Sequence, residues 1–71
     1  MEKLTKLMAL EAVKDIEKIK CDDEVAHSQE DSLHFWFISC VAENMYTKKE
    51  MIEIAEVVKM TAEIDFARWC V

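Results

Sequence analysis

Residues 23–45, DEVAHSQEDSLHFWFISCVAENM, carry the pattern that decides the fold of this chain. At about 100° per residue, a helix over this stretch aligns one stripe of residues at alternating steps of four and three. The stripe consists of Asp23, His27, Glu30, His34, Phe37, Val41 and either Asn44 or Met45. A stripe that faces another helix normally carries Leu, Ile or Val, because it must exclude water. Its polar first half is therefore either a functional site or a hydrated groove at the open end of a small helical bundle.

The second half of the same helix is apolar almost all round. One broad face holds Val25, Ala26, Leu33, Trp36, Phe37, Cys40 and Val41. Phe35, Ile38 and Ala42 lie outside this face. A helix that is apolar on both sides is central in its bundle or is covered by a second protomer.

The composition is typical of a helical chain. The 71 residues are 52% hydrophobic and 34% charged, and they include no Gly and no Pro. Without Gly the chain lacks the usual residue for tight hairpins, and Gly-rich nucleotide-binding loops are excluded. The length predicts one domain over residues 1–71, near the size at which a single core needs support from a metal or an oligomer.

Two further helices flank the central one. The first, near residues 3–20, has an apolar face formed by Leu4, Met8, Ala9, Ala12, Val13, Ile16 and Ile19. The third, near residues 48–62, begins at Thr47-Lys48-Lys49-Glu50, which has the form of a capping box. Its apolar face holds Met51, Ile54, Ala55, Val58 and Ala62, while Val57 lies outside it. A bend near Asp65 would then return Phe66 and Trp69 to the bundle.

The charge balance is acidic, with a net charge of −6. A phosphate backbone would be repelled, so direct nucleic-acid binding is not predicted. An acidic surface can instead meet a basic protein surface, including one that normally holds nucleic acid, or it can simply aid solubility. The three cysteines form no C-x-x-C pair, and no apolar run reaches the roughly 20 residues of a membrane span. We therefore expect a cytoplasmic protein that has no disulfide and does not associate with a membrane.

The polar stripe offers ligands for a divalent transition metal. Imidazole and carboxylate groups bind zinc, manganese or iron, and His27, Glu30 and His34 lie on one side of the helix. Asp23 or Asp31, or a second chain, would complete the site. The spacing matches neither the helical zinc-protease motif nor the paired Glu-x-x-His motifs of ferritin-like proteins. The plainer interpretation is two i, i+4 pairs, His27 with Asp31 and Glu30 with His34.

The same helix also offers a protein-recognition surface. His27, Asp31 and His34 provide hydrogen bonds beside the aromatic area of Phe35 and Trp36, which is the mixture found at binding hot spots. The sequence therefore predicts partner binding on this helix.

The C-terminal residues provide a second candidate. Arg68 and Trp69 form a cationic and aromatic pair that would anchor a partner. Alternatively, Asp65 and Arg68 form an i, i+3 salt bridge that locks the terminal turn.

The segment DDEVAHSQEDSLH, residues 22–34, and the ending IDFARWCV, residues 64–71, resemble a class of small phage and prophage proteins of uncharacterised function. Those proteins pair acidic residues and Ala-His-x-x-Glu-Asp-x-Leu with an Ile-Asp-Phe-x-Arg-Trp-Cys terminus. The resemblance draws attention to Asp23, His27, Glu30, Asp31, Asp65, Arg68 and Trp69. It implies that the protein works in the cytoplasm of an infected bacterium.

Together these patterns predict an all-α, compact three-helix domain with a short C-terminal turn or helix, which forms a homodimer through its middle helix. For function we expect a small acidic protein-binding module of phage origin, acting as an inhibitor by docking on a host or viral protein. No catalysis and no cofactor are predicted. Two alternatives stay open: a metal-binding protein built on His27, Glu30 and His34, and a structural subunit of a viral complex.

Overall fold

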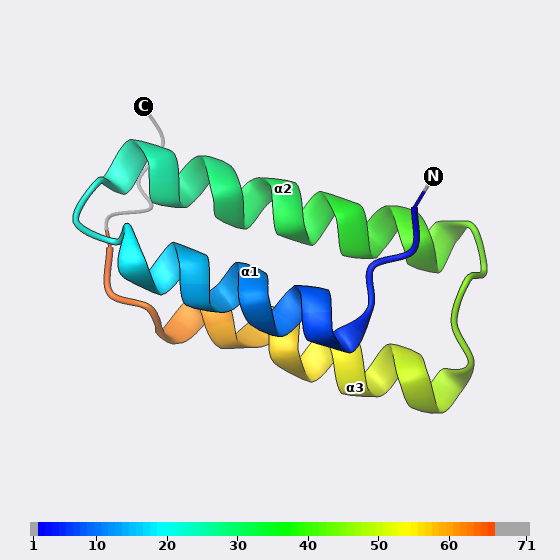
Figure 1. Cartoon of the computed structure of the whole chain (residues 1–71). Helices are drawn as coiled ribbons and strands as arrows, with labels where there is room; N and C mark the ends of the chain where they lie inside the picture. The colour runs from blue at the N-terminus through cyan, green and yellow to red at the C-terminus, as the bar shows by residue number, and fades with distance from the viewer. Residues whose placement is uncertain (1, 67–71) are drawn as a thin grey trace.

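The structure, a computed structural model, describes residues 2–66 and arranges three helices side by side in alternating directions (Figure 1). Helix α1 spans Lys6–Lys18, α2 spans Asp23–Ala42 and α3 spans Lys48–Lys59, and a short 3-10 helix, η1, follows at Met60–Glu63. Each α-helix contacts the other two, and the bundle measures 35 × 20 × 17 Å. The predicted all-α, three-helix fold is confirmed.

The first helix begins later than the sequence predicts. Thr5 is extended, and its hydroxyl accepts a hydrogen bond from the N–H of Met8, which satisfies one of the free donors at the start of α1. Residues 2–5 precede the helix and lie against the C-terminal end of α2 (Figure 1). Leu4 is fully buried, but it belongs to this segment and not to the helix.

Polar side chains start and stop α2 in the absence of Gly and Pro. Asp22 caps the helix by accepting a hydrogen bond from the N–H of Val25. At the other end Asn44 has a φ of 56°, in the left-handed region that Asn tolerates better than most residues. The N–H of Met45 then bonds the carbonyl of Cys40, and the helix ends before the predicted residue 45.

One of the two hydrogen bonds of the predicted capping box is present at the start of α3. The Thr47 hydroxyl accepts a hydrogen bond from the N–H of Glu50. The Glu50 carboxylate, however, pairs with Lys3 at 2.9 Å, so it ties the N-terminal segment to α3. The α-helix ends at Lys59 and continues as η1, which turns Ala62 outward against the prediction.

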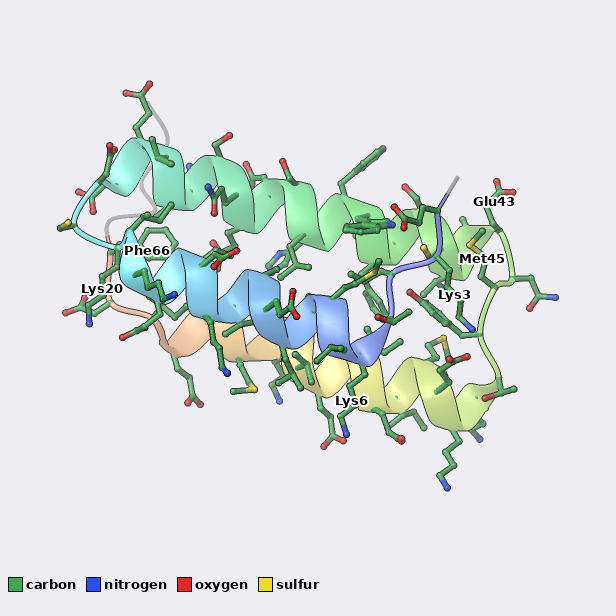
Figure 2. The ribbon with its side chains drawn as sticks, viewed as in Figure 1. Lys3, Lys6, Lys20, Glu43, Met45 and Phe66 are labelled. Carbon is green, nitrogen blue, oxygen red and sulfur yellow. The ribbon has the colours of Figure 1, made fainter. Side chains whose placement is uncertain are left out.

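The core lies between the three helices. It consists of Leu4, Ala9, Val13, Ile16, Ala26, Leu33, Cys40, Ile54, Val57, Val58, Ile64 and Phe66. Val57 was predicted to lie outside the apolar face, but it is buried because α3 packs against both other helices. Val25 and Val41 are exposed, since the buried face of α2 is narrower than predicted. Phe66 returns to the end of the bundle where α1 joins α2, as predicted (Figure 2).

Candidate functional site

The first histidine of α2 lies near the surface. His27 Nε2 is 3.5 Å from Oδ2 of Asp31, one turn further along the helix. The Asp31 side chain is 69% exposed, so solvent screens this pair and it contributes at most about 0.5 kcal/mol to stability. This is one of the two i, i+4 pairs that the sequence predicts.

The second histidine points toward η1. His34 Nε2 lies 2.9 Å from the Thr61 hydroxyl, and that hydroxyl donates to the carbonyl of Val58 at 3.1 Å. The Thr61 hydroxyl therefore lies between the imidazole ring and the main chain of the preceding turn. The hydrogen bond between His34 and Thr61 fastens α2 to η1. The sequence predicts that Glu30 pairs with His34, but Nε2 of His34 contacts Thr61.

The three predicted metal ligands are not gathered by the fold. Glu30 is only 5% exposed, His27 lies beside Asp31, and Nε2 of His34 is engaged with the Thr61 hydroxyl. Among residues 2–66, no group of three or more His, Cys, Asp or Glu side chains is arranged to hold an ion. The buried Glu30 is also out of reach of a docking protein.

Phe35 and Ile38 lie one turn apart on the outer face of α2. Their side chains are 70% and 60% exposed. Ala42 is exposed one turn further on, and Asp31 is exposed one turn before Phe35. The prediction that Phe35, Ile38 and Ala42 lie outside the buried face of this helix is confirmed.

Trp36 was predicted to bind a partner, but its side chain is only partly accessible to solvent. It is half-buried, and its Nε1–H donates to the carbonyl of Glu2 at 2.7 Å. Its ring, together with Ile16 and Leu33, lines a groove of about 200 Å³ between α1 and α2. Trp36 therefore fastens the N-terminal segment, and only part of its ring faces solvent.

The N-terminal segment is held by contacts that the sequence analysis did not predict. The N–H of Leu4 donates to the Cys40 thiol at 3.4 Å, and the Tyr46 hydroxyl donates to the Leu4 carbonyl at 2.6 Å. Both main-chain groups of this buried residue are thus satisfied without regular secondary structure. Helical periodicity carries no signal for these contacts, because they join residues 36 and 42 positions apart.

Tyr46 lies at the centre of this contact. Its ring stacks on Phe37 with a centroid distance of 6.0 Å, and Lys3 Nζ lies 5.5 Å from the ring centroid. Figure 2 shows Lys3 at the same end of the bundle as Glu43 and Met45. Burial, followed by the adjacent Cys40 thiol and Glu50 carboxylate, raises the pKa of Tyr46 well above its ordinary value. The phenol therefore remains a hydrogen-bond donor far above neutral pH.

The predicted C-terminal site lies beyond the part of the chain that the structure describes. Arg68 and Trp69 both fall outside residues 2–66, as does one side of the predicted Asp65–Arg68 salt bridge. Asp65 itself is exposed. The interpretation of this end as an anchor or as a structural clasp stays a prediction.

No known protein family, curated protein or solved structure matches this chain. None of the helices within residues 2–66 combines the length and the apolar character needed to span a bilayer. The fold and the site together define a small acidic three-helix bundle whose middle helix has two distinct faces. One face holds the N-terminal segment, and the other presents Phe35 and Ile38 to solvent.

Proposed function

We propose that this protein is an acidic binding module that docks on another protein through the outer face of α2 and performs no catalysis of its own. The observation that carries the proposal is the exposure of two large apolar side chains, Phe35 and Ile38, one turn apart on one helix. The resemblance to phage and prophage proteins suggests a host or viral protein as the partner.

The surroundings of this pair distinguish it from other exposed apolar residues. Leu7 and Ile52 are also exposed, but charged residues lie one turn away on their own helices, Glu11 in the first case and Lys48 and Glu56 in the second. Single exposed apolar residues of that kind are normal on protein surfaces. Phe35 and Ile38 instead adjoin each other and continue into Ala42.

Burial of this face against a partner would contribute a favourable binding free energy. Burying a side chain such as Phe or Ile contributes about 1.5 to 3 kcal/mol, and a few such residues supply most of the affinity of a typical interface. Asp31, exposed at the edge of the pair, adds a charge that influences partner choice and association rate more than affinity.

The test is an affinity pull-down from infected and uninfected bacterial lysates. The parent protein is compared with the double variant Phe35→Ala, Ile38→Ala and with the control Ile52→Ala, which removes an exposed apolar side chain from α3. We expect a stoichiometric partner that the double variant loses and the control retains. A partner held equally well by all three proteins would contradict docking through this face.

A further inference from the structure

The outer face of α2 carries a second stripe of residues at alternating steps of four and three. Its members are Glu24, Ser28, Asp31, Phe35, Ile38 and Ala42, and all of them are exposed. This spacing is the one by which a helix packs lengthwise along another helix. The stripe is about 27 Å long at 1.5 Å per residue, which is enough for a partner helix of about five turns.

The two halves of this outer stripe differ in chemistry. Glu24, Ser28 and Asp31 make the N-terminal half polar and acidic, whereas Phe35, Ile38 and Ala42 make the C-terminal half apolar. Helix α2 contains no Lys and no Arg along its whole length. A cationic partner would therefore meet no like charge from α2 itself.

We infer that the outer stripe binds an amphipathic helix of another protein, apolar in its N-terminal half and rich in Lys or Arg in its C-terminal half, lying antiparallel to α2. This inference rests on the proposed docking function and specifies the chemistry of the partner. The apolar half of that helix covers Phe35 and Ile38, and its basic half pairs with Glu24 and Asp31.

The antiparallel direction follows from helix electrostatics. The C-terminal half of an antiparallel partner lies beside Glu24 and Asp31. Lys and Arg are favoured near a helix C-terminus because they interact with its partial negative charge. The same basic residues thus stabilise the partner helix and complement the acidic half of the stripe.

A second copy of this chain is a poorer occupant of the outer stripe. A parallel copy would place Glu24 and Asp31 against their own counterparts. An antiparallel copy that pairs Phe35 with Ile38 would set Asp31 against Ala42 of the other copy, where no basic residue of α2 complements its charge. Each chain also carries a net charge of −6, so both arrangements bring like charges together.

The experiment is a selection of binders from a displayed library of 18-residue helical peptides against the full-length protein. The stripe positions of the peptides are randomised among Leu, Ala, Ser, Lys and Glu. We expect enrichment of peptides with Leu in the N-terminal half and Lys in the C-terminal half. Enrichment of acidic or uncharged peptides would overturn the basic partner, and enrichment of the reverse order of halves would overturn the antiparallel arrangement.

Matched variants assign the binding to the outer stripe. With an enriched peptide, Phe35→Ala with Ile38→Ala should weaken affinity about tenfold or more, and Glu24→Lys with Asp31→Lys about fivefold or more. The control Ile52→Ala should have no effect, and circular dichroism verifies that each variant is folded. Added salt should weaken the parent complex more than the complex of the Glu24→Lys, Asp31→Lys variant. Equal affinity across the variants would overturn the proposal.

The outcome separates this inference from the proposed function. If the selection yields no peptide but the pull-down partner still depends on Phe35 and Ile38, docking stands and the helical partner is rejected. If sedimentation shows a dimer that Phe35→Ala dissociates, the occupant is a second copy and the inference is also rejected. If neither partner nor peptide depends on the outer stripe, both proposals fail.

Discussion

Between Phe35 and Ala42, α2 presents two faces that differ in what they contact. On one side Trp36 and Cys40 form hydrogen bonds to the main chain of Glu2 and Leu4. On the other side the side chains of Phe35 and Ile38 remain largely exposed. Within a nearly continuous run of apolar residues, one face thus completes the fold and the other stays exposed to solvent.

The difference shows why the apolar character of a helix segment does not by itself identify a binding surface. Trp36 and Phe35 are adjacent aromatic residues, yet only the second is largely exposed. Substitutions on the face that contacts the N-terminal segment should lower the free energy of unfolding. Substitutions on the outer face should leave that free energy nearly unchanged and affect binding instead.

Among substitutions at the contact between the N-terminal segment and α2, Leu4→Ala should have the largest effect. The side chain is fully buried, and truncating a buried Leu typically lowers the free energy of unfolding by about 2 to 5 kcal/mol. We expect the lower part of this range, because the segment before α1 is short and can relax. Urea denaturation measures the change, with Leu7→Ala as the control because Leu7 is exposed and should change stability by no more than about 0.5 kcal/mol. Equal effects of the two substitutions would show that the N-terminal segment is not docked.

A smaller effect is expected for Tyr46→Phe. The substitution keeps the ring that stacks on Phe37 but removes the hydroxyl that donates to the Leu4 carbonyl. Loss of this bond should lower the free energy of unfolding by about 1 kcal/mol, again measured in urea. In a Leu4→Ala background the cost should shrink, because the two changes disrupt the same contact and their effects are then not additive.

The pH dependence provides a second measurement of the same bond. Tyr46 is the only tyrosine in the chain, so the ultraviolet absorbance of phenolate reports on it alone. Its pKa is raised in the folded state, so its contribution to stability is complete below the unfolded pKa of about 10 and is lost as the pH rises above that value. Ionisation near pH 10 while the protein is still folded would contradict the burial of this hydroxyl.

The sequence predicts the helices well because their signals are local. The Thr47 cap, the acidic start of α2 and the Asn at its end all act within a few residues of themselves. The N-terminal segment could not be predicted in this way. The sequence predicts a helix from residue 3, and Leu4 fits its periodic apolar face. In the structure, hydrogen bonds to Cys40 and Tyr46 hold Leu4 in the segment that precedes α1.

The candidate site was predicted in part. The position of Phe35 on the outer face follows from the angle between residues along α2, and the structure confirms it. The direction of His34 does not follow from that angle alone, because its hydrogen bond to Thr61 depends on where η1 packs. The polar stripe therefore turned out to be partly structural, with His34 and Glu30 facing other parts of the chain.

The smallest effect on stability is expected for Phe35→Ala. The ring is 70% exposed, so little buried area is lost, and the higher helix propensity of Ala offsets part of that loss. The free energy of unfolding should change by no more than about 0.5 kcal/mol, whereas Leu33→Ala on the buried face of the same helix should lower it by about 3 kcal/mol. Urea denaturation of both variants measures the contrast directly. If Phe35→Ala cost more than about 1 kcal/mol, the ring would belong to the folded core, and the outer face would no longer be free to bind a partner.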